Sequence, residues 1–234
     1  MAPVPIDKKA VLAEHFLLAQ LRPEELERLA ASATLTHHPA QATIFEKGDP
    51  GRGMMAVIRG RVKICSYSMG GKELVLNIID QGGLFGEIAL LDGRPRTAHA
   101  VALEDTDLLV LERSRFLPFL TANPEIAVRL ICVLCERLRQ TSEHLEDALF
   151  LEAGPRLARW LLRLAGTFGK ETKEGIRLDI KLSQQQIGNL VGISRESINK
   201  HLGDWQRTGH IQVVNGHITL RDRDALEEIG QSES

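Results

Sequence analysis

The spacing of hydrophobic residues changes along the chain, and each change predicts a different kind of structure. From about residue 7 to 32, leucines recur at helical spacing, and Pro23 suits the start of a helix. From about residue 35 to 112, short β-rich runs are separated by Gly-rich turns, for instance at residues 47–51. Such regular spacing indicates an antiparallel sandwich or barrel.

The next segment predicts one long helix. Asn123 can cap it, Pro124 fits its first position, and nothing breaks the pattern before Gly154 and Pro155. Apolar positions recur in alternating steps of three and four, the heptad spacing with which two helices pair along their length. These positions are Ile131, Leu134, Leu138, Thr141, Leu145 and Ala148, with Thr141 as a polar interruption. The pattern favours a dimer seam, and the alternative is a helix that faces the core of a monomer.

After Pro155 the pattern predicts an amphipathic helix around Trp160 and then a charged loop at residues 169–175. The domain boundary is expected near residues 150–154. We therefore expect three parts, with bounds at 7–122, 123–153 and 154–230.

The segment from Leu182 to Ile211 predicts a helix-turn-helix. Ser183 and Gln186 form a capping box, Gly192 stops the first helix, and Ser194 caps the second. Three residues give the second helix an inward apolar face, namely Ile198, Leu202 and Trp205. A hairpin follows around Asn215-Gly216, a strong type I′ turn signal, so the unit is expected to be a winged helix.

The outward face of the second helix suits the major groove of DNA. Arg195 can donate two hydrogen bonds to guanine, Glu196 can accept one from cytosine, and Lys200 could reach a guanine or a phosphate. The alternative is a merely solvated charged face. The DNA-binding set is expected to comprise Ser183, Gln184, Ser194, Arg195, Glu196, Ser197, Asn199 and Lys200.

Composition constrains the function only weakly. The chain is 43% hydrophobic with a net charge of -2, which argues against indiscriminate coating of nucleic acid but permits a local DNA-binding face. No apolar run reaches the ~18 residues of a membrane helix, and the N-terminus does not resemble a signal peptide. We expect a cytoplasmic protein without a membrane partner, in which Cys132 and Cys135 are reduced core thiols.

A second group of candidate residues lies between the predicted strands, in the segment FGEIALLDGRPRTA. Gly86 lets backbone amides approach an anion, and Arg96 offers a planar fork for a phosphate, with Thr97 as a hydroxyl donor. Glu87 could accept from a ribose hydroxyl. Such a set fits a cyclic nucleotide, and the alternative is a structural ion pair between Glu87 and Arg96. The ligand site is expected to comprise Gly86, Glu87, Ile88, Ala89, Arg96, Thr97 and Ala98, on a loop outside the packed core.

With these motifs the chain resembles the cAMP receptor protein branch of the Crp/Fnr transcription regulators, over nearly all of residues 10–222. Gly86, Glu87, Arg96 and Thr97 match that family's phosphate-binding cassette. The resemblance implies an α+β protein: an N-terminal, jelly-roll-like β-roll that binds a cyclic nucleotide, a long dimerisation helix and a C-terminal winged helix-turn-helix. It implies no catalytic residues and no metal.

The resemblance also implies partners and further contacts. The stretch RLRQTSE is similar to the one that supplies two hydroxyls to the purine base, here Thr141 from one subunit and Ser142 from its partner. SRESINK is similar to the family's SRETVGR, with Lys200 where arginine is usual. A homodimer on double-stranded DNA, at an inverted repeat with TGTGA-like half-sites, is thereby implied. The loop at residues 170–174 occupies the place where relatives touch RNA polymerase.

The effector and the class of protein leave alternatives open. We expect cAMP, with cGMP possible because a hydroxyl can donate or accept; a regulator of this family with another effector or with none is also considered. A cyclic nucleotide hydrolase would need a general base or metal site, and the histidines show no ligand spacing. An iron–sulfur sensor needs about four clustered thiolates, and the chain has three cysteines.

Overall fold

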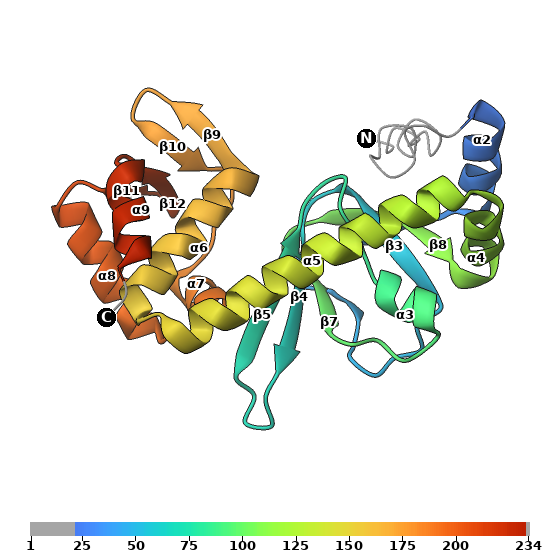
Figure 1. The fold of residues 1–234 in the computed structure, drawn as a ribbon, viewed down its shortest axis with the longest axis horizontal. Coiled ribbons are helices and arrows are strands. Elements are labelled where there is room, and N and C mark those ends of the chain that lie inside the picture. Colours follow the sequence, from blue (N-terminus) through green and yellow to red (C-terminus); the bar gives the residue numbers. More distant parts are fainter. Residues whose placement is uncertain (1–21, 233–234) are drawn as a thin grey trace. The chain divides into compact units, whose positions relative to one another are not determined.

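The computed structural model describes residues 22–232, which divide into two compact units, one ending at Glu136 and one beginning at Arg137. Helix α5 (Pro124–Phe150) runs through this division (Figure 1). Helix α2 (Pro23–Ser32) begins at Pro23, as the sequence predicts. The rest of that predicted helix and the N-terminal segment lie outside the described residues.

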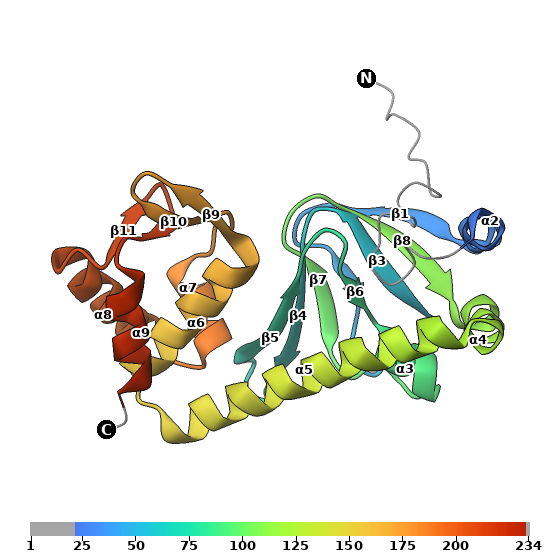
Figure 2. The ribbon, with the colours of Figure 1, turned by 45° about the horizontal axis from the view of Figure 1, so that its top comes forward.

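The strands of the first unit form two four-stranded antiparallel sheets, with the orders β1-β8-β3-β6 and β2-β7-β4-β5 (Figure 2). Buried residues from both sheets, among them Val57, Val62 and Leu108, form one cluster, so the sheets pack face to face. The predicted sandwich is confirmed. The shortest strands, however, have too few residues to show an alternation of hydrophobic and polar positions in the sequence. The strands are β1 (Thr34–His38), β2 (Thr43–Phe45), β3 (Gly53–Arg59), β4 (Val62–Tyr67), β5 (Glu73–Ile79), β6 (Leu84–Phe85), β7 (His99–Ala102) and β8 (Thr106–Glu112).

Helices cover the β1-β8-β3-β6 sheet. Helix α3 (Glu87–Asp92), helix α4 (Arg113–Ala122), α2 and the first turns of α5 all contribute to one buried cluster with the strands. Its largest members include Leu90, Phe116 and Leu130 from the helices and Met54 and Leu111 from the strands. This packing fixes α3, and with it the candidate ligand loop, against the sheet.

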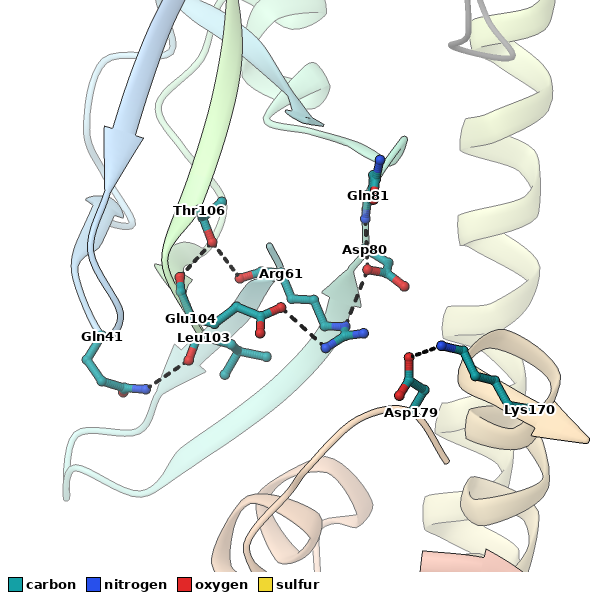
Figure 3. A network of polar contacts seen from close by, with 9 residues as sticks. All are labelled: Gln41, Arg61, Asp80, Gln81, Leu103, Glu104, Thr106, Lys170 and Asp179. Atoms are coloured by element: carbon teal, nitrogen blue, oxygen red, sulfur yellow. Dashed lines mark hydrogen bonds and ion pairs between the residues drawn. The ribbon is translucent and has the colours of Figure 1, made fainter. Parts of the chain in front are cut away.

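An ion-pair network holds the turns at one end of the sandwich together. Arg61, between β3 and β4, lies 3.3 Å from Asp80 after β5 and 3.3 Å from Glu104 between β7 and β8 (Figure 3). The hydroxyl of Thr106 donates to the carbonyl of Glu104 at 2.7 Å. Gly60 has a φ of 87°, and a Cβ there would lie 2.5 Å from the Thr106 hydroxyl, so this tight turn requires glycine.

Helix α5 leaves much of its apolar surface exposed within a single chain. Leu138 is 68% exposed and Leu145 is 60% exposed, both on the predicted heptad seam. The monomer-core alternative therefore does not hold for these positions. Cys132 and Cys135 are also exposed, so their prediction as core thiols was wrong; helical spacing shows a face but not what covers it.

The second unit combines a small sheet with helices. Its sheet has the order β11-β12-β10-β9. The elements are α6 (Ala153–Phe168), β9 (Gly169–Thr172), β10 (Gly175–Leu178), α7 (Gln184–Val191), α8 (Arg195–Arg207), β11 (Ile211–Val214), β12 (His217–Leu220) and α9 (Arg223–Gln231). The interpretation of residues 169–175 as a loop was wrong, because β9 and β10 pair as a hairpin from Gly175 opposite Thr172. Every residue of β9 is exposed, so it shows no hydrophobic alternation to read.

Gly188 allows the close packing of α7 on the turn that follows it. A Cβ at this position would lie 2.8 Å from the carbonyl oxygen of Ile193. We expect Gly188→Ala to lower the free energy of unfolding of the second unit by about 1–3 kcal/mol, as is usual for overpacking. Urea unfolding followed by tryptophan fluorescence reports on this unit, because both tryptophans, Trp160 and Trp205, lie in it.

The matched control is Gly166→Ala, on the exposed side of α6, where an added Cβ meets nothing within 4 Å. That change should stabilise the unit by up to about 1 kcal/mol through helix propensity. Equal stability of the two variants would contradict the packing argument.

Candidate functional site

Arg96 is the centre of the candidate ligand site in the first unit. It follows α3 in the loop that leads to β7, and it is only 6% exposed. Its Nη1 donates to the carbonyl of Gly86 at 2.7 Å, and its guanidinium lies 4.3 Å from the centre of the Phe45 ring. Within the described residues its Nε has no hydrogen-bond partner. A buried guanidinium with an unused N–H donor can bind an anion.

The backbone around Arg96 is held by the loop after β2. The backbone N–H of Arg96 donates to the carbonyl of Asp49, and the N–H of Gly48 donates to the carbonyl of Arg96, both at 2.9 Å. Burial lowers the pKa of Arg96 below its ordinary value, and the carboxylates of Asp49 and Glu87 oppose part of that shift. Burial therefore disfavours the charged form of Arg96, and a bound anion would favour it.

Gly86 has two reasons to be glycine. Its φ is 78°, and a Cβ there would lie 2.6 Å from Nη1 of Arg96. Glu87, the first residue of α3, is 1% exposed, so the loop is more buried than the sequence interpretation expected. The structure thus brings Gly86, Glu87 and Arg96 together. Of the other predicted ligand residues, Ala89 and Ala98 are buried and Ile88 and Thr97 are exposed.

Sequence reasoning missed Phe45 and Asp49. Both contact Arg96 from a distant part of the chain, Phe45 through its ring and Asp49 through its carbonyl. No local pattern around either residue points to Arg96, since an aromatic residue at the end of a strand is ordinary core material.

Thr141 and Ser142 belong to the second unit, on the exposed surface of α5. The hydroxyl of Thr141 donates to the carbonyl of Arg137 at 2.8 Å, and that of Ser142 donates to the carbonyl of Leu138 at 3.0 Å. A hydroxyl that gives its proton to the preceding turn keeps its lone pairs for an outside donor. Both side chains therefore offer acceptors to solvent.

The end of α5 is held to α6 by a buried carboxylate. Asp147 is 1% exposed, and its two oxygens lie 2.8 Å from Nη1 of Arg159 and 2.6 Å from Nη2 of Arg163. One turn earlier, the ring of His144 stacks on Trp160 at 4.5 Å between centroids. Burial lowers the pKa of His144, and the nearby Arg163 cation lowers it further. These contacts join the last turns of α5 to α6.

The helix-turn-helix forms as its sequence predicts. The hydroxyl of Ser183 accepts from the N–H of Gln186 at 3.2 Å, while the Gln186 side chain accepts from the N–H of Ser183 at 2.8 Å. Gly192 ends α7 with a φ of 76°. Ser194 caps α8 by accepting from the N–H of Ser197 at 3.1 Å. The predicted inward residues Ile198, Leu202 and Trp205 are buried.

The outward face of α8 carries four of the eight predicted DNA-binding residues, while Ser183 and Ser194 are exposed caps and Gln184 and Ser197 are half-buried. Arg195, Glu196, Asn199 and Lys200 are all exposed. The backbone N–H of Glu196 and then the Ser194 hydroxyl lower the pKa of the Glu196 carboxyl, which therefore stays ionised near neutral pH. Next to this face, β11 and β12 form the predicted wing, with positive φ at both turn residues, Asn215 (52°) and Gly216 (81°).

A metal site would show as clustered ligands, and a membrane-spanning structure as long apolar helices, within residues 22–232. Among them no group of three or more His, Cys, Asp or Glu side chains could hold a metal ion. No single helix in this part of the chain is long and apolar enough to cross a membrane, although α4 and α5, joined at a bend of 113°, pass that test as a pair.

Both halves of the chain match known families. Residues 35–123 match the family described as cyclic nucleotide-binding domain, and residues 155–229 match the Crp-like helix-turn-helix domain. The chain is 31% identical to a CRP-like cAMP-activated global transcriptional regulator of Mycobacterium tuberculosis, over 92% of this chain and 96% of that protein. It is 32% identical to the cyclic AMP receptor protein of Thermus thermophilus, over 89% and 94%.

A solved structure agrees with this likeness. A transcriptional regulator of the CRP/FNR family from Thermus thermophilus superimposes with a TM-score of 0.71 at 27% identity, covering 86% of this chain and all (100%) of that one.

Proposed function

The chain belongs to the CRP/FNR family of transcription regulators, in its cyclic-nucleotide-responsive branch, and from that premise we propose that cAMP is the effector that controls its binding to DNA. The family consists of regulators rather than enzymes. The observation that carries the proposal is the buried Arg96, whose Nε has no partner within the described residues and whose fork is held by Gly86 and Phe45. The cyclic phosphate is an anion that this fork can bind, while Glu87 accepts from the ribose hydroxyl.

The hydroxyls of α5 favour adenine over guanine. Thr141 and Ser142 both donate to carbonyls of the preceding turn, so they offer lone pairs outward. The adenine N6 amino group is a donor and matches these lone pairs, with Thr141 acting from one subunit and Ser142 from its partner. The guanine O6 carbonyl needs a donor, so each hydroxyl would have to leave its intrahelical bond, which is worth about 0.5–1.5 kcal/mol.

We propose a homodimer in which the partner's helix α5 covers the exposed apolar seam of this one. Its seam positions Ile131, Leu138 and Leu145 are each more than half exposed in a single chain. Pairing two copies along the seam removes this apolar surface from water at roughly 25 cal/mol per Å². A two-fold dimer then carries two recognition helices, which suits an inverted repeat with half-site centres about one helical turn, ~34 Å, apart. TGTGA-like half-sites follow from the family resemblance, with Arg195, Glu196 and Lys200 facing the bases.

Asp147 supplies the coupling between nucleotide and DNA. The hydroxyls of Thr141 and Ser142 lie one to two turns before Asp147 on the same helix, and Asp147 is paired with two arginines of α6. A change in how α5 meets its partner is therefore passed to α6 and the helices that pack on it. The exposed segment at residues 170–174 is the surface offered to RNA polymerase. The protein acts in the cytoplasm.

The first prediction from the proposed function concerns the phosphate contact. Arg96→Ala should weaken nucleotide binding more than about tenfold, or roughly 1.4 kcal/mol, because the phosphate loses its cation. Calorimetric titration with cAMP and then cGMP measures this, with circular dichroism as the check that the variant folds. Arg94→Ala is the matched control, since Arg94 is exposed in the same loop. A folded Arg96→Ala protein that binds cAMP within tenfold of wild type would refute the site.

The second prediction concerns the dimer. Leu138→Asp puts a charge on the exposed seam and should yield monomers at micromolar concentrations, where the wild-type protein is a dimer by light scattering. Gln140→Glu adds the same charge at an exposed position off the heptad seam and should remain dimeric. A monomeric wild-type protein, or a dimeric Leu138→Asp variant, contradicts the seam.

The third prediction concerns coupling. Asp147→Asn keeps the shape of the side chain but removes the charge that pairs Arg159 and Arg163. The factor by which cAMP tightens DNA binding, typically about 5–150 for coupled sites, should fall toward one while cAMP binding itself persists. DNA affinity is measured with and without saturating cAMP at fixed salt, because salt alone changes it steeply.

Glu143→Gln is the matched control for coupling. Glu143 is 59% exposed and lies 3.9 Å from Arg163, so losing its charge should leave the factor unchanged. An unaltered factor in a folded Asp147→Asn variant rules out the transmission through this pair.

A further inference from the structure

A hydrogen bond on the outside of the helix-turn-helix links its two helices. Nε2 of Gln184, the first residue of α7, donates to Oδ1 of Asn199 on α8 at 3.1 Å, across 15 residues of sequence. Gln184 itself is half-buried, and it directly follows the Ser183 cap, so its backbone is fixed. The bond therefore ties an exposed side chain of α8 to a residue whose backbone is fixed at the start of α7.

Asn199 stands in the middle of the DNA-facing surface. It lies one helical turn after Arg195 and beside Lys200, and all three are exposed. Residues at this spacing share a face, so Asn199 faces the groove that Arg195 faces. A side chain there has the reach to contact the base pair next to the one that Arg195 reads.

The bond decides which part of the Asn199 amide is offered to the groove. A carboxamide carries an acceptor oxygen and a donor NH₂ group, and a free amide can turn either toward a base. Here the oxygen is turned toward Gln184, which leaves the Nδ2 donor for another acceptor. In the major groove the acceptors are N7 of either purine, O6 of guanine and O4 of thymine, whereas cytosine offers only a donor.

We propose that Gln184 is a positioning residue for sequence recognition: it orients Asn199 so that Nδ2 donates to an acceptor on a base edge. This rests on the proposed DNA-reading role of α8. It adds a read position to each half-site beyond those of Arg195, Glu196 and Lys200. It also assigns Gln184 an effect on sequence preference, which a contact to phosphate alone would not have.

The experiment compares preference profiles. Wild-type protein saturated with cAMP selects its best site from a random DNA pool, and affinities are then measured for that site with each base pair of the half-site replaced in turn. Asn199→Ala should flatten the preference at one base pair by about fivefold or more, the low end for a single base contact. Gln184→Ala should flatten it at the same base pair, and the double variant should be no flatter than Asn199→Ala.

An isosteric variant tests the donor. Asn199→Asp can still accept from Gln184, but it presents oxygen where Nδ2 stood, so preference at that base pair should move toward cytosine. Gln185→Ala is the matched control, because Gln185 makes the same kind of bond, to Asn189 at 2.9 Å, within α7 alone. Its profile should equal that of wild type.

Three outcomes overturn the assignment. A uniform loss of affinity across all sites in Gln184→Ala makes Gln184 a phosphate contact, and an unchanged profile in Asn199→Ala removes Asn199 as a reader. A preference that does not move toward cytosine in Asn199→Asp removes the donor role. A wild-type protein without any sequence preference is a different result, because it refutes the proposed function of α8 itself.

Discussion

The ion pairs of the buried Asp147 carboxylate with Arg159 and Arg163 hold the end of α5 against α6. A carboxylate that is 1% exposed is unstable in the interior unless its charge is fully paired, and the guanidiniums of Arg159 and Arg163 pair it. The end of α5 cannot turn relative to α6 without breaking both contacts and the stack of His144 on Trp160. Through this constraint the helix with the exposed apolar seam is tied to α6 and to the helices that pack on α6.

Two features of the single chain are unusual in a folded protein: exposed leucines along one helix and a buried cation with an unpaired donor. The seam of α5 keeps Leu138 and Leu145 in water, and Arg96 is a buried cation with an unused donor. A folded chain rarely retains such features without a use. A second copy would cover the seam and an anion would satisfy Arg96. Both features are thus consistent with a protein whose working state is assembled by binding.

The helix-turn-helix was predictable because its determinants are local. The Ser183–Gln186 capping box, the left-handed Gly192 and the Asn215-Gly216 turn each act within a few residues, so each can be read from the sequence and each is confirmed. The β9–β10 hairpin was not predictable from the same signals. All residues of β9 are exposed, so the strand needs no alternation of hydrophobic and polar residues. Its hydrogen bonds to β10 involve the backbone, which leaves no signal in the sequence.

The sequence alone determined the β-sandwich, the long helix, the helix-turn-helix with its inward residues and the residue types of the two candidate sites, because these follow from period, capping and functional groups. Tertiary structure decided what those residues contact. It exposed Cys132 and Cys135, brought Phe45 and Asp49 to Arg96, buried Asp147 between two arginines and turned the Asn199 amide toward Gln184. The physical reason is that burial and hydrogen-bond partners depend on segments far apart in the chain, which no local pattern encodes.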